Sequence, residues 1–194
     1  MQPRISSALT AAAVLVLAGC DAPPETTGPE FSSHAGVTGS ANGGGHFDAG
    51  VDVVFSFGIV QFNGFDATGQ LRFSTALGGQ AIEFHGRATC LAIDAENGRA
   101  WVGGVVTQNN STHPSFTSPV HQVGRDIWFR VVDYGEGGKA PQADRTTFVG
   151  FEGSAGIITS EEYCQTRPWP GPPDDVVDAR TGPVTEGNIQ VRAR

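Results

Sequence analysis

Apolar and polar side chains alternate along several stretches of the chain between residues 51 and 153. The run VDVVFSFGIVQF, residues 51–62, is apolar at every second position, and GQLRFSTA, residues 69–76, repeats the pattern around Leu71 and Phe73. Strict alternation over this length predicts strands with one buried face. Three further runs are also predicted to be strands: AWVGGVVT (residues 100–107), DIWFRVVD (126–133) and RTTFVGFEG (145–153).

The run QAIEFHGRATCLAID, residues 80–94, changes parity along its length. Ile82 and Phe84 are even, whereas Leu91 and Ile93 are odd. Either a bulge at His85-Gly86 resets the register, or the strand is covered on both sides. The pair Asn97-Gly98 follows, and between two strands it predicts a hairpin with a type I′ turn, pairing residues 89–94 with 100–107.

These runs predict an all-β fold. About seven strands joined mostly by short connections form an antiparallel meander, closed as a barrel or folded as a sandwich. Glycine supplies 27 of the 194 residues, about twice its usual share, and it falls between the alternating runs as turn residues do. No amphipathic helix of useful length is predicted, apart from a possible turn at SEEYC, residues 160–164.

The N-terminus carries an apolar stretch from Ala8 to Ala18 that breaks at Cys20. The stretch is too short for a transmembrane helix and is typical of a signal peptide, predicted here over residues 1–19. Its last four residues, LAGC, resemble the lipobox of bacterial lipoproteins, which implies lipidation of Cys20. The alternative is an ordinary signal peptide cut near Ala18. Residues 20–45, rich in Pro, Gly, Ser, Thr and acid, are expected to be a disordered tether.

The folded domain is expected to cover residues 46–164. The remaining residues, 165–194, are rich in proline and show little alternation, so they are expected to be irregular, although Trp169 could dock on the domain. The net charge of −8 and the single lysine, Lys139, argue against a nucleic-acid partner, which requires clustered Lys and Arg. The same acidity argues against contact with anionic lipid beyond the anchor.

Two cysteines remain once Cys20 carries lipid, namely Cys90 and Cys164. An even pair in an exported protein is expected to form a disulfide, and the alternative is two buried free thiols. Their spacing does not fit a metal site, because neither lies in a Cys-x-x-Cys pair. No metal and no cofactor are predicted.

Three runs carry a resemblance to a known group of proteins: HGRATCLAID (85–94), RAWVGGVVT (99–107) and FRVVDYGEGG (129–138). In this order they are similar to a recurrent domain of secreted bacterial proteins that has no assigned activity. The similarity covers residues 39–151 and implies one exported domain, with no catalytic residue. The chain departs from that pattern at Tyr134, where the family more often has Asn, which weakens a loop function that depends on the amide.

Three histidines and one glutamate are candidates for binding. Glu83 and His85 lie two residues apart, so they share one side of a strand. In a regular strand they would share the face of Leu91 and could line a pocket inside a barrel, whereas a bulge would turn them to solvent. His113 and His121 lie in the polar loop 109–122, where a barrel or sandwich could hold a binding surface.

Two further possibilities have weaker support in the sequence. Asp133, Glu136 and Asp144 flank a glycine-rich loop and offer oxygen ligands for Ca²⁺, but they lack the spacing of a calcium loop, which favours a plain connection. Nucleophilic catalysis lacks support, because the chain has no G-x-S-x-G elbow.

Two functions from different classes fit these residues. The favoured one is a non-catalytic binding or envelope module, tethered by lipid to a membrane of the bacterial cell envelope, with a ligand or partner that the sequence does not identify. The alternative is a small barrel enzyme, a hydrolase or an isomerase, that uses Glu83 and His85. Catalysis needs an acid, a base and an orienting group, and the sequence names only a pair.

Overall fold

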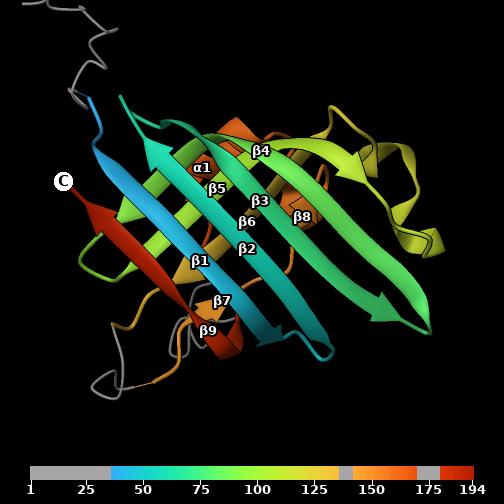
Figure 1. Ribbon diagram of the computed structural model, residues 1–194. Coiled ribbons are helices and arrows are strands. Elements are labelled where there is room, and N and C mark those ends of the chain that lie inside the picture. The colour runs from blue at the N-terminus through green and yellow to red at the C-terminus, as the bar shows by residue number, and fades with distance from the viewer. Residues whose placement is uncertain (1–35, 136–141, 170–179) are drawn as a thin grey trace, which may run out of the picture. The chain divides into compact units, whose positions relative to one another are not determined.

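A computed structural model describes residues 36–135, 142–169 and 180–194 (Figure 1). The signal peptide, Cys20 and most of the predicted tether lie outside the described residues. The strands are β1 (Gly39–Asp48), β2 (Asp52–Gln61), β3 (Asp66–Leu77), β4 (Gln80–Asp94), β5 (Arg99–Asn109), β6 (Asp126–Val132), β7 (Arg145–Thr146), β8 (Gly150–Phe151) and β9 (Gly182–Ala193). One α-helix, α1 (Ser160–Thr166), and three short 3₁₀ turns, Pro114–Phe116, Pro119–His121 and Ser154–Gly156, complete the described part.

The strands form a closed antiparallel barrel. Neighbours in the chain pair from β1 through to β6, then β6 pairs with β7, β7 with β9, and β9 with β1. Eight strands therefore close the ring, and β8 is added beside the start of β6. The fold is all-β as predicted, and of the two architectures left open it is the barrel.

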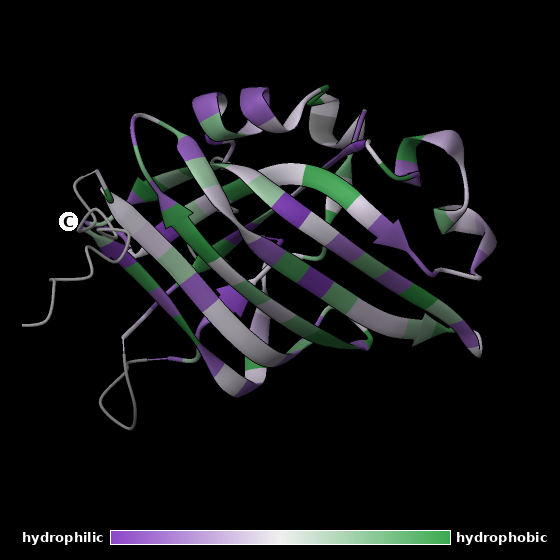
Figure 2. Ribbon diagram, turned by 45° about the horizontal axis from the view of Figure 1, so that its top comes forward, coloured by the Kyte–Doolittle hydropathy of each residue, from purple (hydrophilic) through white to green (hydrophobic). Residues whose placement is uncertain are grey.

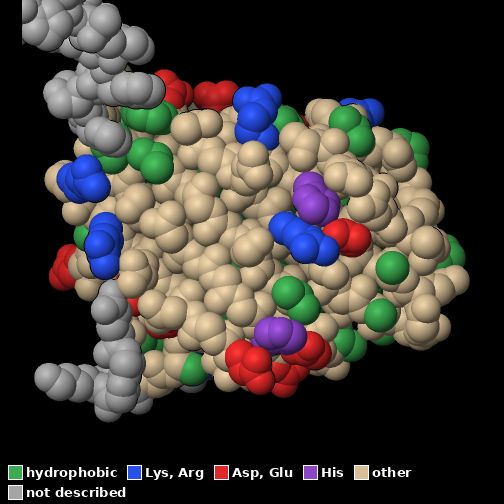
Figure 3. Space-filling view, in the orientation of Figure 1, with side chains coloured by type: hydrophobic (Ala, Val, Ile, Leu, Met, Phe, Trp, Pro, Cys, Tyr) green, Lys and Arg blue, Asp and Glu red, His purple; other side chains and the backbone are tan. Residues whose placement is uncertain are grey.

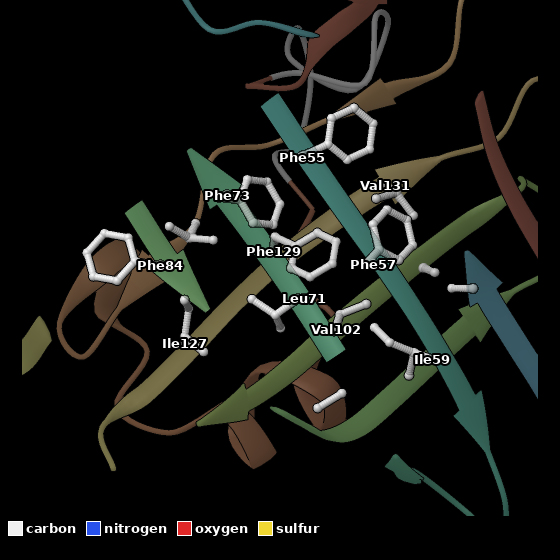
Figure 4. Packing of buried hydrophobic residues seen from close by; sticks show 14 of the residues in the cluster. Phe55, Phe57, Ile59, Leu71, Phe73, Phe84, Val102, Ile127, Phe129 and Val131 are labelled. Carbon is white, nitrogen blue, oxygen red and sulfur yellow. The ribbon is translucent and has the colours of Figure 1, made fainter. Parts of the chain in front are cut away.

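Aromatic side chains fill the barrel (Figure 4). Phe73 of β3 and Phe129 of β6 meet across the interior with ring centroids 5.0 Å apart, and Phe57 of β2 lies 5.1 Å from Phe129. The alternating residues of β2 and β3 point inward as predicted, since Phe55, Phe57 and Ile59 of β2 and Leu71 and Phe73 of β3 are all buried. The interior is thus a packed core.

The outer face of β4, β5 and β6 is also covered, because α1 packs against it (Figure 2). A second apolar cluster fills this contact: Cys90, Ala92, Trp101, Trp128, Ile157, Tyr163 and Cys164, with Trp169 packed against it. Gly103 of β5 allows the approach, because a Cβ there would lie 2.6 Å from the carbonyl oxygen of Ser160. Both faces of β5 and β6 are therefore buried over most of their length.

Strand β4 changes faces through a bulge. The pairing with β5 shifts between His85 and Gly86, as expected, but there the extra residue lies in β5. A second shift between Ala88 and Cys90 leaves Thr89 of β4 unpaired, and this shift turns Cys90 outward and Leu91 inward. The bulge that changes the faces of β4 therefore lies at Thr89 and not at His85-Gly86 as predicted, and the second half of the strand is also covered on both sides.

The predicted domain limits were wrong at both ends. β1 begins at Gly39, inside the predicted tether, and β9 occupies residues 182–193 of the predicted irregular tail. β1 does not look like a strand because glycines lie between its inward residues Ala41 and Phe47; a Cβ at Gly43 would lie 2.8 Å from the ring of Phe57. β9 shows no regular hydrophobic alternation, because a register shift opposite His46 interrupts it between the inward residues Val184 and Ile189.

Two smaller predictions also needed correction. The hairpin between β4 and β5 exists, but its turn spans residues 95–98, and within it only Gly98 has positive φ, at 63°. A Cβ on Gly98 would lie 2.1 Å from the carbonyl oxygen of Asp133, so close backbone approach also requires glycine. The run 145–153 forms two short strands, β7 and β8, instead of one.

Candidate functional site

Glu83 and His85 lie on the outside of the barrel, next to Arg72 of β3. The Glu83 Oε1 atom accepts hydrogen bonds from Arg72 Nη2 at 2.8 Å and Nε at 3.1 Å, and it lies 3.0 Å from His85 Nε2. The hydrogen bond with His85, followed by that with Arg72, lowers the pKa of the Glu83 carboxyl despite partial burial. The three side chains form one polar network, in which Glu83 orients the imidazole.

Two surface hollows adjoin this network. One, of about 520 Å³, is lined by His85, Gln70 and Arg87, and the other, of about 270 Å³, by His85, Gly58 and Arg72. Most of the surrounding face carries neither charge nor large apolar groups (Figure 3). The enzyme hypothesis needs an inward His85 with a cavity beyond it, and this condition is not met, because the inward positions of β4 hold Ile82 and Phe84.

His113 and His121 lie in the loop that closes one end of the barrel, and both pack on Phe116, with ring centroids 5.9 and 5.4 Å away. His121 also lies 4.5 Å from Phe151, and burial lowers the pKa of its imidazole. His113 Nδ1 accepts a hydrogen bond from the backbone N–H of Ser115. The structure therefore gives each of these two histidines a packing or capping role.

Asp133 and Asp144, for which the sequence favoured a plain connection over a calcium site, bind backbone N–H groups of β9 and of the segment after β6. Asp144 accepts hydrogen bonds from the backbone N–H groups of Tyr134, at 3.0 Å, and Ile189, at 2.7 Å. Asp133 accepts from the N–H of Val191 at 2.8 Å. Burial raises the pKa of Asp144, and the Ile189 N–H opposes that shift. These carboxylates replace ladder bonds where β9 extends past the two-residue strand β7, while Glu136 lies outside the described residues.

Cys90 and Cys164 form a disulfide that joins β4 to α1, with Cα atoms 6.2 Å apart. Hydrogen bonds fix the helix at its start: Thr159 Oγ1 accepts from the N–H of Glu162, and Asp126 of β6 accepts from both the N–H and the hydroxyl of Ser160. The sequence T-x-x-E at residues 159–162 is the signal that could have identified this helix start.

Sequence reasoning missed a pocket of about 450 Å³ beside α1. Its lining includes Trp128, Arg130, Tyr163, Trp169 and Arg180. Trp128 stacks on Tyr163 with ring centroids 5.6 Å apart. These residues come from β6, from α1 and from the predicted irregular tail, so no local motif marks them; only the folded chain brings them together.

The chain matches no family model, no curated protein and no solved structure. Among the described residues, no three His, Cys, Asp or Glu side chains gather closely enough to hold a metal ion. No helix in the described ranges is long and apolar enough to cross a membrane. The function is therefore inferred from the residues and geometry of this chain.

Proposed function

We propose that this protein is a lipoprotein of the bacterial cell envelope, anchored through Cys20, whose barrel serves as a non-catalytic binding module. The observation that carries the proposal is the Cys90–Cys164 disulfide. Disulfides persist in exported proteins and are rare in the cytosol, so the bond supports an extracytoplasmic location. Two of the three cysteines form this bond, so Cys20 is the cysteine that is available for lipid.

The barrel core supports binding over catalysis. Phenylalanines fill the interior, so a ligand has to bind on the outside or at an end. On the outside, Glu83 already binds Arg72 and His85, and this network is partly exposed to solvent, with 23% of the Glu83 side chain and 35% of the His85 side chain accessible. Catalysis needs a protected acid, base and orienting group around a reacting atom, and this network offers no enclosed site for one.

Phase partitioning tests the anchor. Expressed in a bacterial host, the full chain should enter the detergent phase of a Triton X-114 extract, and intact mass analysis should show loss of residues 1–19 and a lipid mass on Cys20. The variant Cys20→Ser should lose both signals. Wild-type protein in the aqueous phase with an unmodified Cys20 would refute the lipoprotein assignment.

A further inference from the structure

The pocket beside α1 has aromatic walls. Trp128 and Tyr163, stacked on each other, form one wall, and Trp169 contributes another part of the lining. Trp169 is held in place by an edge contact with Trp101, 5.8 Å between ring centroids, and by the guanidinium of Arg99, 3.9 Å from its ring centre. Flat apolar walls of this kind favour flat ligands, which can stack on them.

The same pocket is lined by cationic and hydrogen-bond-donating groups. Arg130 and Arg180 both reach its lining, and the Arg130 guanidinium lies 4.5 Å from the ring centre of Trp169. Burial lowers the pKa of Arg130 and the neighbouring Tyr163 opposes this shift, while the positive charges of Arg180 and Arg99 lower the pKa further. Arg130 Nη1 also donates a hydrogen bond to the carbonyl oxygen of Pro168 at 3.2 Å.

We propose that this pocket binds a small anion carried on a flat aromatic body, such as an aromatic carboxylate. The anionic group would face Arg130 and Arg180, while the ring would lie on the aromatic lining that Trp128, Tyr163 and Trp169 supply. A volume of about 450 Å³ lies within the range of small-molecule sites. The assignment rests on the proposed binding function but not on the lipid anchor, and it holds whether or not Cys20 carries lipid.

Tryptophan fluorescence provides a direct readout, because all three tryptophans of the chain, Trp101, Trp128 and Trp169, line the pocket or contact its lining. The full chain, purified with its disulfide intact, is titrated with 2-naphthoate and with the uncharged 2-naphthamide, and calorimetry gives the stoichiometry. We expect one naphthoate per chain, bound at least about tenfold more tightly than the amide, since hydrogen bonds to a charged group are the stronger ones.

Three variants locate the site. Arg180→Gln should weaken naphthoate binding about tenfold and leave the amide unchanged, because only the anion loses a charged partner. Thr147→Trp, which fills the pocket without altering its charge, should abolish binding of both compounds. Arg125→Gln makes the same chemical change on the loop at the barrel end and should leave both affinities as they are.

Two results would overturn the proposal. The first is the lack of saturable naphthoate binding to the folded parent chain. The second is naphthoate binding that survives Thr147→Trp or that Arg180→Gln and Arg125→Gln affect equally. Neither result depends on the phase-partitioning experiment, so failure of the pocket and failure of the anchor are distinguishable.

Discussion

The outer face of the barrel is exposed on one side and covered on the other. β2 and β3 bury one face and expose the other, and their hydrophobic pattern alternates along each strand (Figure 2). β5 and β6 bury both faces, one in the barrel and one under α1. The interior of this small barrel is filled, and the covered side adds a second layer with a pocket, which is where we propose that a ligand binds.

The largest expected difference in the free energy of unfolding is between residues that point out of the barrel on its two sides. Trp101 of β5 and Val54 of β2 both point out of the barrel, but Trp101 is 4% exposed and Val54 is 43% exposed. Trp101→Ala should lower the free energy of unfolding by about 3–5 kcal/mol, as for other buried aromatic truncations. Val54→Ala should change it by less than about 0.5 kcal/mol. Urea denaturation of the two variants measures both values, and similar losses would remove the distinction between the two sides.

Removal of the disulfide should have the next largest effect on the free energy of unfolding. Cys90 and Cys164 are 74 residues apart, and replacing both with Ala should lower the free energy of unfolding by about 2–4 kcal/mol. The near-ultraviolet circular dichroism of the tryptophans should weaken as α1 loosens, whereas the far-ultraviolet signal of the barrel should persist. Reduction of the parent chain is the matched control and should have the same effect. An unchanged unfolding midpoint would show that packing alone holds α1.

The smallest effect concerns the solvated network of Glu83, His85 and Arg72. The pKa of Glu83 lies below its ordinary value of 4.5 in the folded chain, so on acidification the unfolded chain takes up this proton first. The network therefore stabilises the fold above about pH 4.5, and this contribution is lost as the pH falls through the folded pKa. Because the network is partly exposed, its contribution to the free energy of unfolding should be about 0.2–1 kcal/mol.

Glu83→Gln tests this sign, and Glu161→Gln, at an exposed glutamate of α1, is its matched control. Unfolding curves between pH 3 and pH 7 should show a shallower acid loss for Glu83→Gln than for the parent chain. A steeper acid loss in Glu83→Gln would mean that the carboxylate is unfavourable in the fold.

Local pattern was sufficient for β2 to β6, whether one face of the strand is buried or both. The alternation of residues 51–62 and 69–76 predicted β2 and β3, and the parity change in residues 80–94 predicted a bulged or doubly covered strand. It failed for β1 and β9, because glycines and a bulge remove the alternation and the strands depend on each other across most of the chain.

The candidate sites show the same limit. Glu83 and His85 are close together, as their spacing requires, but the residues next to them could not decide which face they occupy. The bulge at Thr89 and the packing of the interior decided it. The aromatic pocket unites Trp128 and Arg130 of one strand with Trp169 and Arg180 of the tail, and neither segment carries a signal for the other.

Hydrogen–deuterium exchange of the oxidised and reduced full chain tests the distinction between the two sides most directly. Reduction should raise exchange in α1, whose last turn carries Cys164, and in the following segment up to Trp169. Amides in β2 and β3, whose stability depends on the barrel interior, should keep their protection. An equal rise across all strands, or no rise in α1, would contradict the account that the disulfide specifically secures the covered side.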